Sequence, residues 1–254
     1  MKALFIFGTR PEAIKMAPVI LEFRKCDKID PVVAVTGQHR EMLDQVLHFF
    51  GIVPDFDLNL MTGGQSLCTL TARAVEGLER VIDEVKPGMI LVQGDTTSAF
   101  AGAYVGFLKK IPVAHIEAGL RTGNRREPFP EEINRQLIGN LADLHLCPTS
   151  IAVSNLVAEG KSENVFLVGN TVIDALLHGL HILGDDWRPL EPKLLGMMNP
   201  NGSILITIHR RESFGSGVHG ILKAIKRLAI CHPQMSFVFP VHIPPSGQLE
   251  LSLH

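Results

Sequence analysis

The sequence is poor in tyrosine, tryptophan and net charge. Tyr104 and Trp187 are its single tyrosine and tryptophan, and the other aromatic residues are 13 phenylalanines. Lysine and arginine together number 24 against 26 acidic residues, which gives a formal net charge of −2. Nucleic-acid-binding proteins carry basic surfaces and often stack bases on aromatic rings. We therefore expect neither a nucleic-acid partner nor a charged membrane surface as a partner.

Cysteine is also scarce, and long apolar runs are absent. The sequence contains four cysteines and no CxxC pair: Cys26, Cys68, Cys147 and Cys231. This spacing predicts reduced core thiols rather than a disulfide framework or a zinc site. The histidines lack HExxH spacing, so no metal site is expected. The first run, MKALFIF, is too short for a signal peptide, and no run approaches the ~18 apolar residues of a membrane helix. A soluble cytoplasmic protein is the expectation.

Short apolar runs alternate with helical patterns along most of the chain. Among the runs are ALFIF, PVVAVT, MILVQ, PVAHIE, DLHLC and NVFLV, and REMLDQVLHFF and EEINRQLIGNLA are examples of the helical segments between them. This alternation predicts βαβ units and an α/β fold with a largely parallel sheet. Because 46% of the 254 residues are hydrophobic, the chain can form one large domain or two smaller ones.

The alternation is interrupted near residue 184. The segment GDDWRPLEPKLLGMMNPNG contains three prolines and three glycines, which is typical of a linker. A new apolar run, SILITI, begins at Ser203. We predict a first domain over residues 1–183, a linker over 184–202 and the start of a second domain over 203–254. Because a complete domain of this kind typically needs ~100 residues, the second domain is expected to be incomplete.

Polar residues follow the apolar runs where the strands should end. In open parallel sheets, ligands bind outside the carboxyl ends of the strands. The run ALFIF leads to Arg10, MILVQ leads to Asp95, and PVAHI leads to Glu117. His209 follows SILITI in the same way. We therefore expect functional side chains to lie at the carboxyl ends of the strands.

The first turn, GTRPEAIK, combines signals for the start of a helix with positive charge. Thr9 and Glu12 have the spacing of a capping box, and Pro11 lies in the first helical turn. Arg10 and Lys15 oppose the helix macrodipole, but an anion bound by free N–H groups and both side chains would reverse that penalty. The turn alone leaves open a phosphate or sugar-phosphate site and a solvated helix start. It matches neither GxGxxG nor a Walker loop.

Carboxylates gather in the segments QGDTTSA, HIEAGLRTG and PFPEEINR. Asp95 follows a strand, Glu117 ends one, and Glu131 lies near the start of a helix. Helix capping and a solvated charged face are the structural alternatives. A partly desolvated carboxylate suits general acid–base chemistry, and several in one pocket suit removal and return of a proton at carbon. The segment HRRESFG is either surface charge or a cationic cluster that faces a diphosphate.

Six segments, taken in order, resemble the non-hydrolysing UDP-N-acetylglucosamine 2-epimerases of bacteria: GTRPEAIKMAP, GDTTSA, HIEAGLRTG, PFPEEINR, GNTVIDAL and HRRESFG. The resemblance extends from Met1 to about His242. It implies a GT-B-like fold, with two Rossmann-like domains and the substrate between them. It also implies interconversion of UDP-GlcNAc and UDP-ManNAc without a cofactor, through elimination of UDP, a 2-acetamidoglucal intermediate and re-addition. The product would feed polysaccharide biosynthesis.

The resemblance implies roles for individual residues. The acid–base candidates are Asp95, Glu117 and Glu131, and which of them acts on which face of the sugar stays open. The nucleotide and the departing diphosphate are expected to contact Arg10, Lys15 and His209, so that His209 also counts as catalytic. A second UDP-GlcNAc is expected as an allosteric activator, bound by Gln38, Glu41, Arg210 and His242. Family members are commonly homodimers.

Three departures from the family pattern bear on function. Gln93 stands where histidine is usual before GDTT, and Ile208 replaces a small residue before HRRE. The chain ends in VHIPPSGQLELSLH, without the Ser-Gly-Gly segment and downstream glutamate that hold UDP in the family. Two alternatives therefore stay open, an inactive fragment of the epimerase and a GT-B glycosyltransferase. The missing wall of the site predicts little or no turnover by these 254 residues alone.

Overall fold

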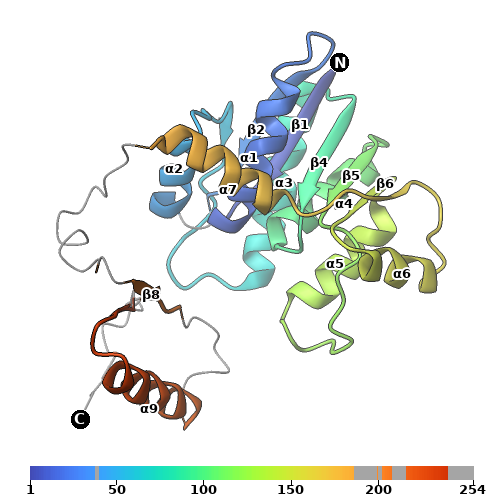
Figure 1. The fold of residues 1–254 in the computed structure, drawn as a ribbon. Coiled ribbons are helices and arrows are strands. Elements are labelled where there is room, and N and C mark those ends of the chain that lie inside the picture. Colours follow the sequence, from blue (N-terminus) through green and yellow to red (C-terminus); the bar gives the residue numbers. More distant parts are fainter. Residues whose placement is uncertain (38–39, 186–198, 200–201, 208–215, 240–254) are drawn as a thin grey trace. The chain divides into compact units, whose positions relative to one another are not determined.

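The computed structural model describes residues 1–37, 40–185, 199, 202–207 and 216–239 (Figure 1). The chain divides into two compact units, Met1–Leu183 and Gly184–His254. The predicted linker over residues 184–202 falls mostly outside the described ranges.

A parallel seven-stranded sheet forms the centre of the first unit. Its order is β3-β2-β1-β4-β5-β6-β7, and all neighbouring strands are parallel. The chain order reverses between β1 and β4, which is where ligands bind in doubly wound folds. The strands are β1 (Lys2–Phe7), β2 (Asp30–Val35), β3 (Phe56–Asp57), β4 (Met89–Gln93), β5 (Val113–Ile116), β6 (Leu144–Cys147) and β7 (Val165–Leu167).

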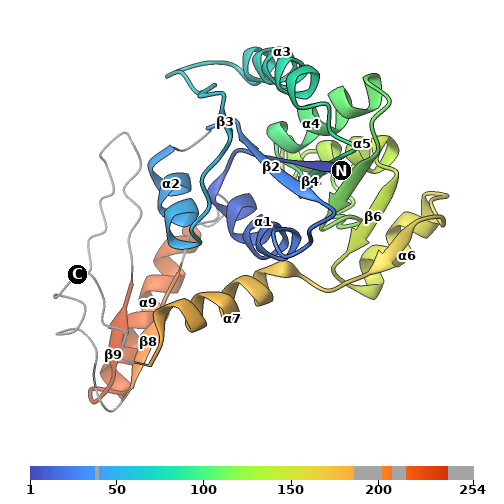
Figure 2. The same cartoon turned by 90° about the horizontal axis from the view of Figure 1, so that it is seen from above.

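Helices cover both faces of this sheet (Figure 2). Successive side chains of a strand point to opposite faces. Leu4 and Ile6 of β1 therefore pack with α3, α4 and α5, whereas Phe5 and Phe7 pack with α1, α2 and α7. The helices are α1 (Arg10–Phe23), α2 (Arg40–Phe49), α3 (Leu67–Val85), α4 (Thr97–Leu108), α5 (Glu131–Leu141), α6 (Ser150–Ala158) and α7 (Thr171–Leu183).

Close packing at the end of β1 brings the neighbouring turns together. A Cβ atom on Gly8 would lie 2.0 Å from the Thr36 Oγ1 atom and 2.5 Å from the Ser98 Oγ atom. Those two hydroxyl groups are 2.6 Å apart and buried. Because no side chain fits between them, glycine is required at position 8. The turns that follow β1, β2 and β4 thus meet at one edge of the sheet.

The second unit contains a short βαβ arrangement within its described part. β8 (Ser203–Leu205) pairs in parallel with β9 (Ser236–Val238), and α9 (Ser216–Cys231) connects the two strands in sequence. No helix of the described ranges is long and apolar enough to cross a membrane.

The cysteines correct one sequence prediction. All four are free, but Cys147 is the buried one, whereas Cys26, Cys68 and Cys231 are exposed. Cys26 lies in the turn after α1, and Cys68 and Cys231 lie in end turns of helices. The prediction of core thiols is therefore wrong for three of the four, because cysteine spacing carries no information about burial.

Candidate active site

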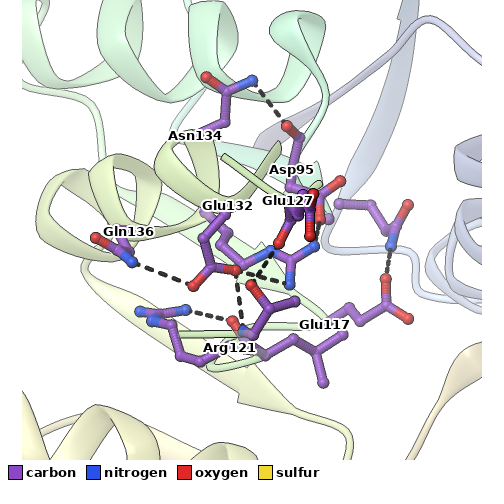
Figure 3. Close-up of polar contacts among 12 residues, drawn as sticks. Asp95, Glu117, Arg121, Glu127, Glu132, Asn134 and Gln136 are labelled. Carbon is purple, nitrogen blue, oxygen red and sulfur yellow. Dashed lines mark hydrogen bonds and ion pairs between the residues drawn. The ribbon is translucent and has the colours of Figure 1, made fainter. Parts of the chain in front are cut away.

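Residues from distant parts of the first unit meet beyond the carboxyl ends of β4 and β5. Asp95 follows β4 and Glu117 follows β5, and both are labelled in Figure 3. Lys15 comes from α1, and Glu131 begins α5. The parallel pairing of β4 with β5 places the two turns side by side, because parallel strands end at the same edge.

The Glu117 carboxylate is surrounded by hydrogen-bond donors. The Lys15 Nζ atom lies 2.7 Å from each carboxylate oxygen. The Gln93 Nε2 atom donates to Oε2 at 2.5 Å, and the Asn170 Nδ2 atom donates to Oε1 at 3.0 Å. The Glu117 side chain is 12% exposed and that of Lys15 is 22% exposed. This carboxylate is thus held by side chains from α1, β4 and the turn before α7.

The turn after β4 is bound to β5 through both backbone groups of Gly94. The Gly94 N–H donates to the Ile116 carbonyl at 3.0 Å, and the His115 Nε2 atom lies 2.7 Å from the Gly94 carbonyl oxygen. Burial lowers the pKa of His115 to about 4, so the ring is neutral at neutral pH and donates through Nε2. Glu117 itself has a φ of 64°, a left-handed conformation uncommon outside glycine. The backbone around both carboxylates is therefore tightly constrained.

Asp95 is paired with Arg135 of α5. The Arg135 Nη2 atom donates to the Asp95 Oδ2 atom, and the Asn134 Nδ2 atom donates to the Asp95 carbonyl at 2.9 Å (Figure 3). Burial raises the pKa of Asp95, the positive charge of Arg135 opposes that shift, and the negative charges of Glu131 and Glu117 add to it. Asp95 therefore retains a proton more readily than an ordinary aspartate does.

Glu131 and Glu132 are adjacent on α5 but have different environments. Glu132 is fully buried and accepts hydrogen bonds from the Thr122 and Gly123 N–H groups at 3.1 and 3.3 Å (Figure 3). Burial by itself would raise the pKa of Glu132, but these hydrogen bonds outweigh it and the pKa is lowered. Glu131 is half-buried and adds its charge to the surroundings of Asp95. The sequence-predicted candidate is thus the neighbour whose charge acts on the pKa of Asp95.

In the first turn, the Glu12 side chain binds backbone groups at the start of α1. The Glu12 carboxylate accepts the Gly8 N–H at 3.0 Å, the Thr9 N–H at 2.8 Å and the Thr96 hydroxyl at 2.6 Å. The contact of Glu12 with the Thr9 N–H is the one that the capping box predicts, and the same carboxylate also occupies the Gly8 N–H. Burial raises the pKa of Glu12 despite these hydrogen bonds. Arg10 is exposed at this turn.

Several predicted residues lie outside the described ranges, namely Gln38, Ile208, His209, Arg210 and His242. Glu41 lies within α2, but its side chain is not described. The sequence alone assigns no role to Gln93, Asn170 or Arg135, although each contacts a candidate carboxylate. A positional signal existed for all three, because Gln93 ends β4, Asn170 follows β7, and Arg135 lies one helical turn after Glu131.

The chain is similar in sequence to known proteins of one family. Residues 21–253 match the model of the UDP-N-acetylglucosamine 2-epimerase family. The chain is 46% identical over 246 residues to the UDP-N-acetylglucosamine 2-epimerase of Bacillus subtilis and 47% identical over 250 residues to that of Escherichia coli. These alignments cover 96% and 97% of this chain but 63% and 66% of the relatives. The chain therefore spans slightly less than two thirds of their length.

Solved structures show the same likeness. The UDP-GlcNAc 2-epimerase of Neisseria meningitidis bound to UDP-GlcNAc is 46% identical with a TM-score of 0.85, over 96% of this chain and 67% of that one. The Staphylococcus aureus MnaA structure with UDP is 45% identical with a TM-score of 0.85, and the alignment covers 96% of this chain and 63% of that one. These neighbours confirm the predicted α/β, GT-B-like fold class. The chain belongs to the UDP-N-acetylglucosamine 2-epimerase family.

Proposed function

We propose that this chain carries the acid–base residues of a cytoplasmic enzyme that interconverts UDP-GlcNAc and UDP-ManNAc for polysaccharide biosynthesis. The observation that carries the proposal is the placement of Asp95 and Glu117 on adjacent strand ends, where this fold class binds its ligands. The ligands of the neighbouring structures, UDP-GlcNAc and UDP, support a nucleotide-sugar substrate.

In the proposed reaction, a carboxylate removes the C2 proton of the sugar while the bond from C1 to the UDP oxygen breaks. The electron pair of the C–H bond forms the C1=C2 double bond of 2-acetamidoglucal, and UDP leaves with the electrons of its C1–O bond. A carboxylic acid then protonates C2 on the opposite face as UDP adds again to C1. Asp95, Glu117 and Glu131 share these roles, and the raised pKa of Asp95 suits it to hold a proton.

The departing diphosphate needs cations. Arg10 is exposed at the first turn, and Lys15 already lies beside the site. His209 completes the proposed set of diphosphate contacts. We also propose that UDP-GlcNAc acts as an activator at Gln38, Glu41, Arg210 and His242, and that the protein forms a homodimer.

The reaction is tested by incubating the 254-residue chain with UDP-GlcNAc in D2O, with the Bacillus subtilis relative as a positive control. Long incubations at high protein concentration are needed, because we expect turnover far below that of the relative. The expected product is UDP-ManNAc with deuterium at C2. Product with fully retained C2 protium would contradict the elimination route.

The same experiment separates the epimerase from the two alternatives. A glycosyltransferase needs an acceptor, so it leaves C2 unlabelled and forms no UDP-ManNAc. Absence of any deuterium at C2, while the relative labels its substrate, would contradict epimerase activity of this chain, and transfer of the sugar to a supplied acceptor would then distinguish a glycosyltransferase from an inactive fragment.

A further inference from the structure

The Glu117 carboxylate has no free position for a proton. The Oε1 atom accepts from Lys15 at 2.7 Å and from Asn170 at 3.0 Å. The Oε2 atom accepts from Lys15 at 2.7 Å and from Gln93 at 2.5 Å. A carboxylate offers about four lone-pair sites, and all of them are used here. Glu117 can take a proton from carbon only after a donor leaves.

The three donors differ in how easily they leave. Gln93 is 2% exposed and ends β4. Asn170 is anchored through its Oδ1 atom, which accepts the Val172 N–H at 3.1 Å. Lys15 is attached through a flexible stem, and 22% of its side chain is exposed. It is also the one cation that contacts Glu117 within the described ranges. Lys15 is therefore the donor that an incoming anion can attract.

We propose that Lys15 is an exchangeable partner of Glu117, and that a bound diphosphate draws it away and so frees the carboxylate for catalysis. This inference rests on the proposed function and deepens it. A diphosphate carries more negative charge than one carboxylate and offers more acceptor oxygens to the three N–H donors of lysine. When Lys15 moves, one lone pair on each Glu117 oxygen becomes free. Gln93 and Asn170 then act as positioning residues that keep the carboxylate in place.

The exchange has a measurable cost for nucleotide binding. While Lys15 is paired with Glu117, the conformation that binds a diphosphate is only a fraction of the population, and the apparent affinity falls by that fraction. Removing the negative charge of Glu117 should release Lys15 and tighten binding. We expect Glu117→Gln to lower the Kd for UDP by about fivefold, a population effect of this kind.

The test is calorimetric titration of the 254-residue chain with UDP. Wild type, Glu117→Gln, Lys15→Met and the double variant are compared. Lys15→Met should weaken UDP binding, and the double variant should bind UDP no more tightly than Lys15→Met alone. The control is Glu22→Gln, which removes one negative charge from the exposed Glu22–Lys25 pair at the end of α1 and should leave the Kd unchanged.

The outcomes distinguish the exchange from the proposed function. If UDP binds equally well to wild type and to Glu117→Gln, or if the gain persists without Lys15, the exchange is refuted while the nucleotide site stands. If no variant binds UDP, both proposals fail.

The positioning role of Gln93 has its own readout. Gln93→Leu removes the donor to Glu117, so the rate of C2 deuteration should fall about tenfold or more while the Kd for UDP stays constant. Gln93→His retains an N–H donor and should recover most of that rate. An equal loss of deuteration rate in both variants, or a parallel change in the Kd for UDP, would contradict the positioning role of Gln93.

Discussion

Glu117 and Glu132 are glutamates with both carboxylate oxygens engaged in hydrogen bonds, yet they differ in which groups donate those bonds. Glu132 accepts two backbone N–H groups and the Gln136 side chain at 3.2 Å, and it pairs with Arg135 at 3.3 Å. Glu117 accepts side-chain donors throughout, among them Lys15. Backbone amides cannot leave without disrupting the loop that carries them, whereas a lysine side chain can rotate away.

This difference indicates how one site contains both structural and reactive carboxylates. Burial alone does not separate them, because both glutamates are largely shielded from water. The lowered pKa of Glu132 keeps it ionised, so it holds the loop at Thr122 and Gly123 in place. The donors of Glu117 are movable, which leaves that carboxylate available for chemistry.

The largest expected effect is on rate. Glu117→Gln and Asp95→Asn should each lower the rate of C2 deuteration about 10²-fold or more, the usual scale for general acid–base groups, with little change in Tm. The rate is measured by NMR in D2O, and Tm is measured by calorimetry. Thr97→Ala, in the first turn of α4, serves as the control and should lower the rate of C2 deuteration much less. Near-normal rates for both carboxamide variants would show that these groups serve the fold instead.

The second effect is on stability. Glu132→Gln places an NH2 group against the N–H groups of Thr122 and Gly123, so the free energy of unfolding should fall by about 2 kcal/mol, the cost of a buried mismatch. Denaturant titration measures it. The matched control is Glu131→Gln, which makes the same chemical change one residue earlier and should cost no more than about 0.5 kcal/mol. Equal losses in the two variants would remove the distinction between these neighbours.

A third effect appears in acid. Hydrogen bonding to Arg121, at 2.6 and 2.8 Å, lowers the pKa of Glu159 to about 2. The folded-state pKa lies below the unfolded value near 4.5, so this pair stabilises the fold above pH 4.5 and its contribution is lost as the pH falls toward 2. Glu159→Gln should therefore show a shallower loss of Tm across that range. An unchanged slope would show that the pair contributes nothing.

The smallest effect is expected at Glu12, where burial raises the pKa. A glutamine can still accept the Gly8 and Thr9 N–H groups, and the Thr96 hydroxyl can turn to accept from its amide. Glu12→Gln should thus change stability by less than about 1 kcal/mol at pH 7.

The pH dependence of Glu12→Gln has the opposite sign to that of Glu159→Gln. A folded-state pKa above 4.5 means that the folded protein binds the proton more tightly than the unfolded chain does. The stability of wild type should therefore rise relative to that of Glu12→Gln as the pH falls toward 4.5. The difference in Tm between the two proteins from pH 7 to pH 4.5 is the measurement. A difference that moves the other way would mean that Glu12 is stabilised as a carboxylate.

Much of the fold was predictable because its signals are local. Alternating apolar runs predicted the parallel α/β sheet, and the Thr9–Glu12 spacing predicted the capping box of α1. Asp95 and Glu117 were candidates because each follows an apolar run, and both lie at strand ends in the structure. The cysteine prediction was wrong because exposure depends on packing, which spacing does not report.

By itself, the sequence determined the order of strands and helices and the residue types that follow each strand. Only the tertiary structure decided which of those residues meet. Lys15 and Glu117 are 102 positions apart, and Asn170 is 53 positions beyond Glu117. Their contact follows from the order of β1, β4 and β5 in the sheet and from the packing of α1 and α7 on one face. Hydrophobic periodicity acts over a few residues, whereas a carboxylate is satisfied by whichever donors packing brings within about 3 Å of it.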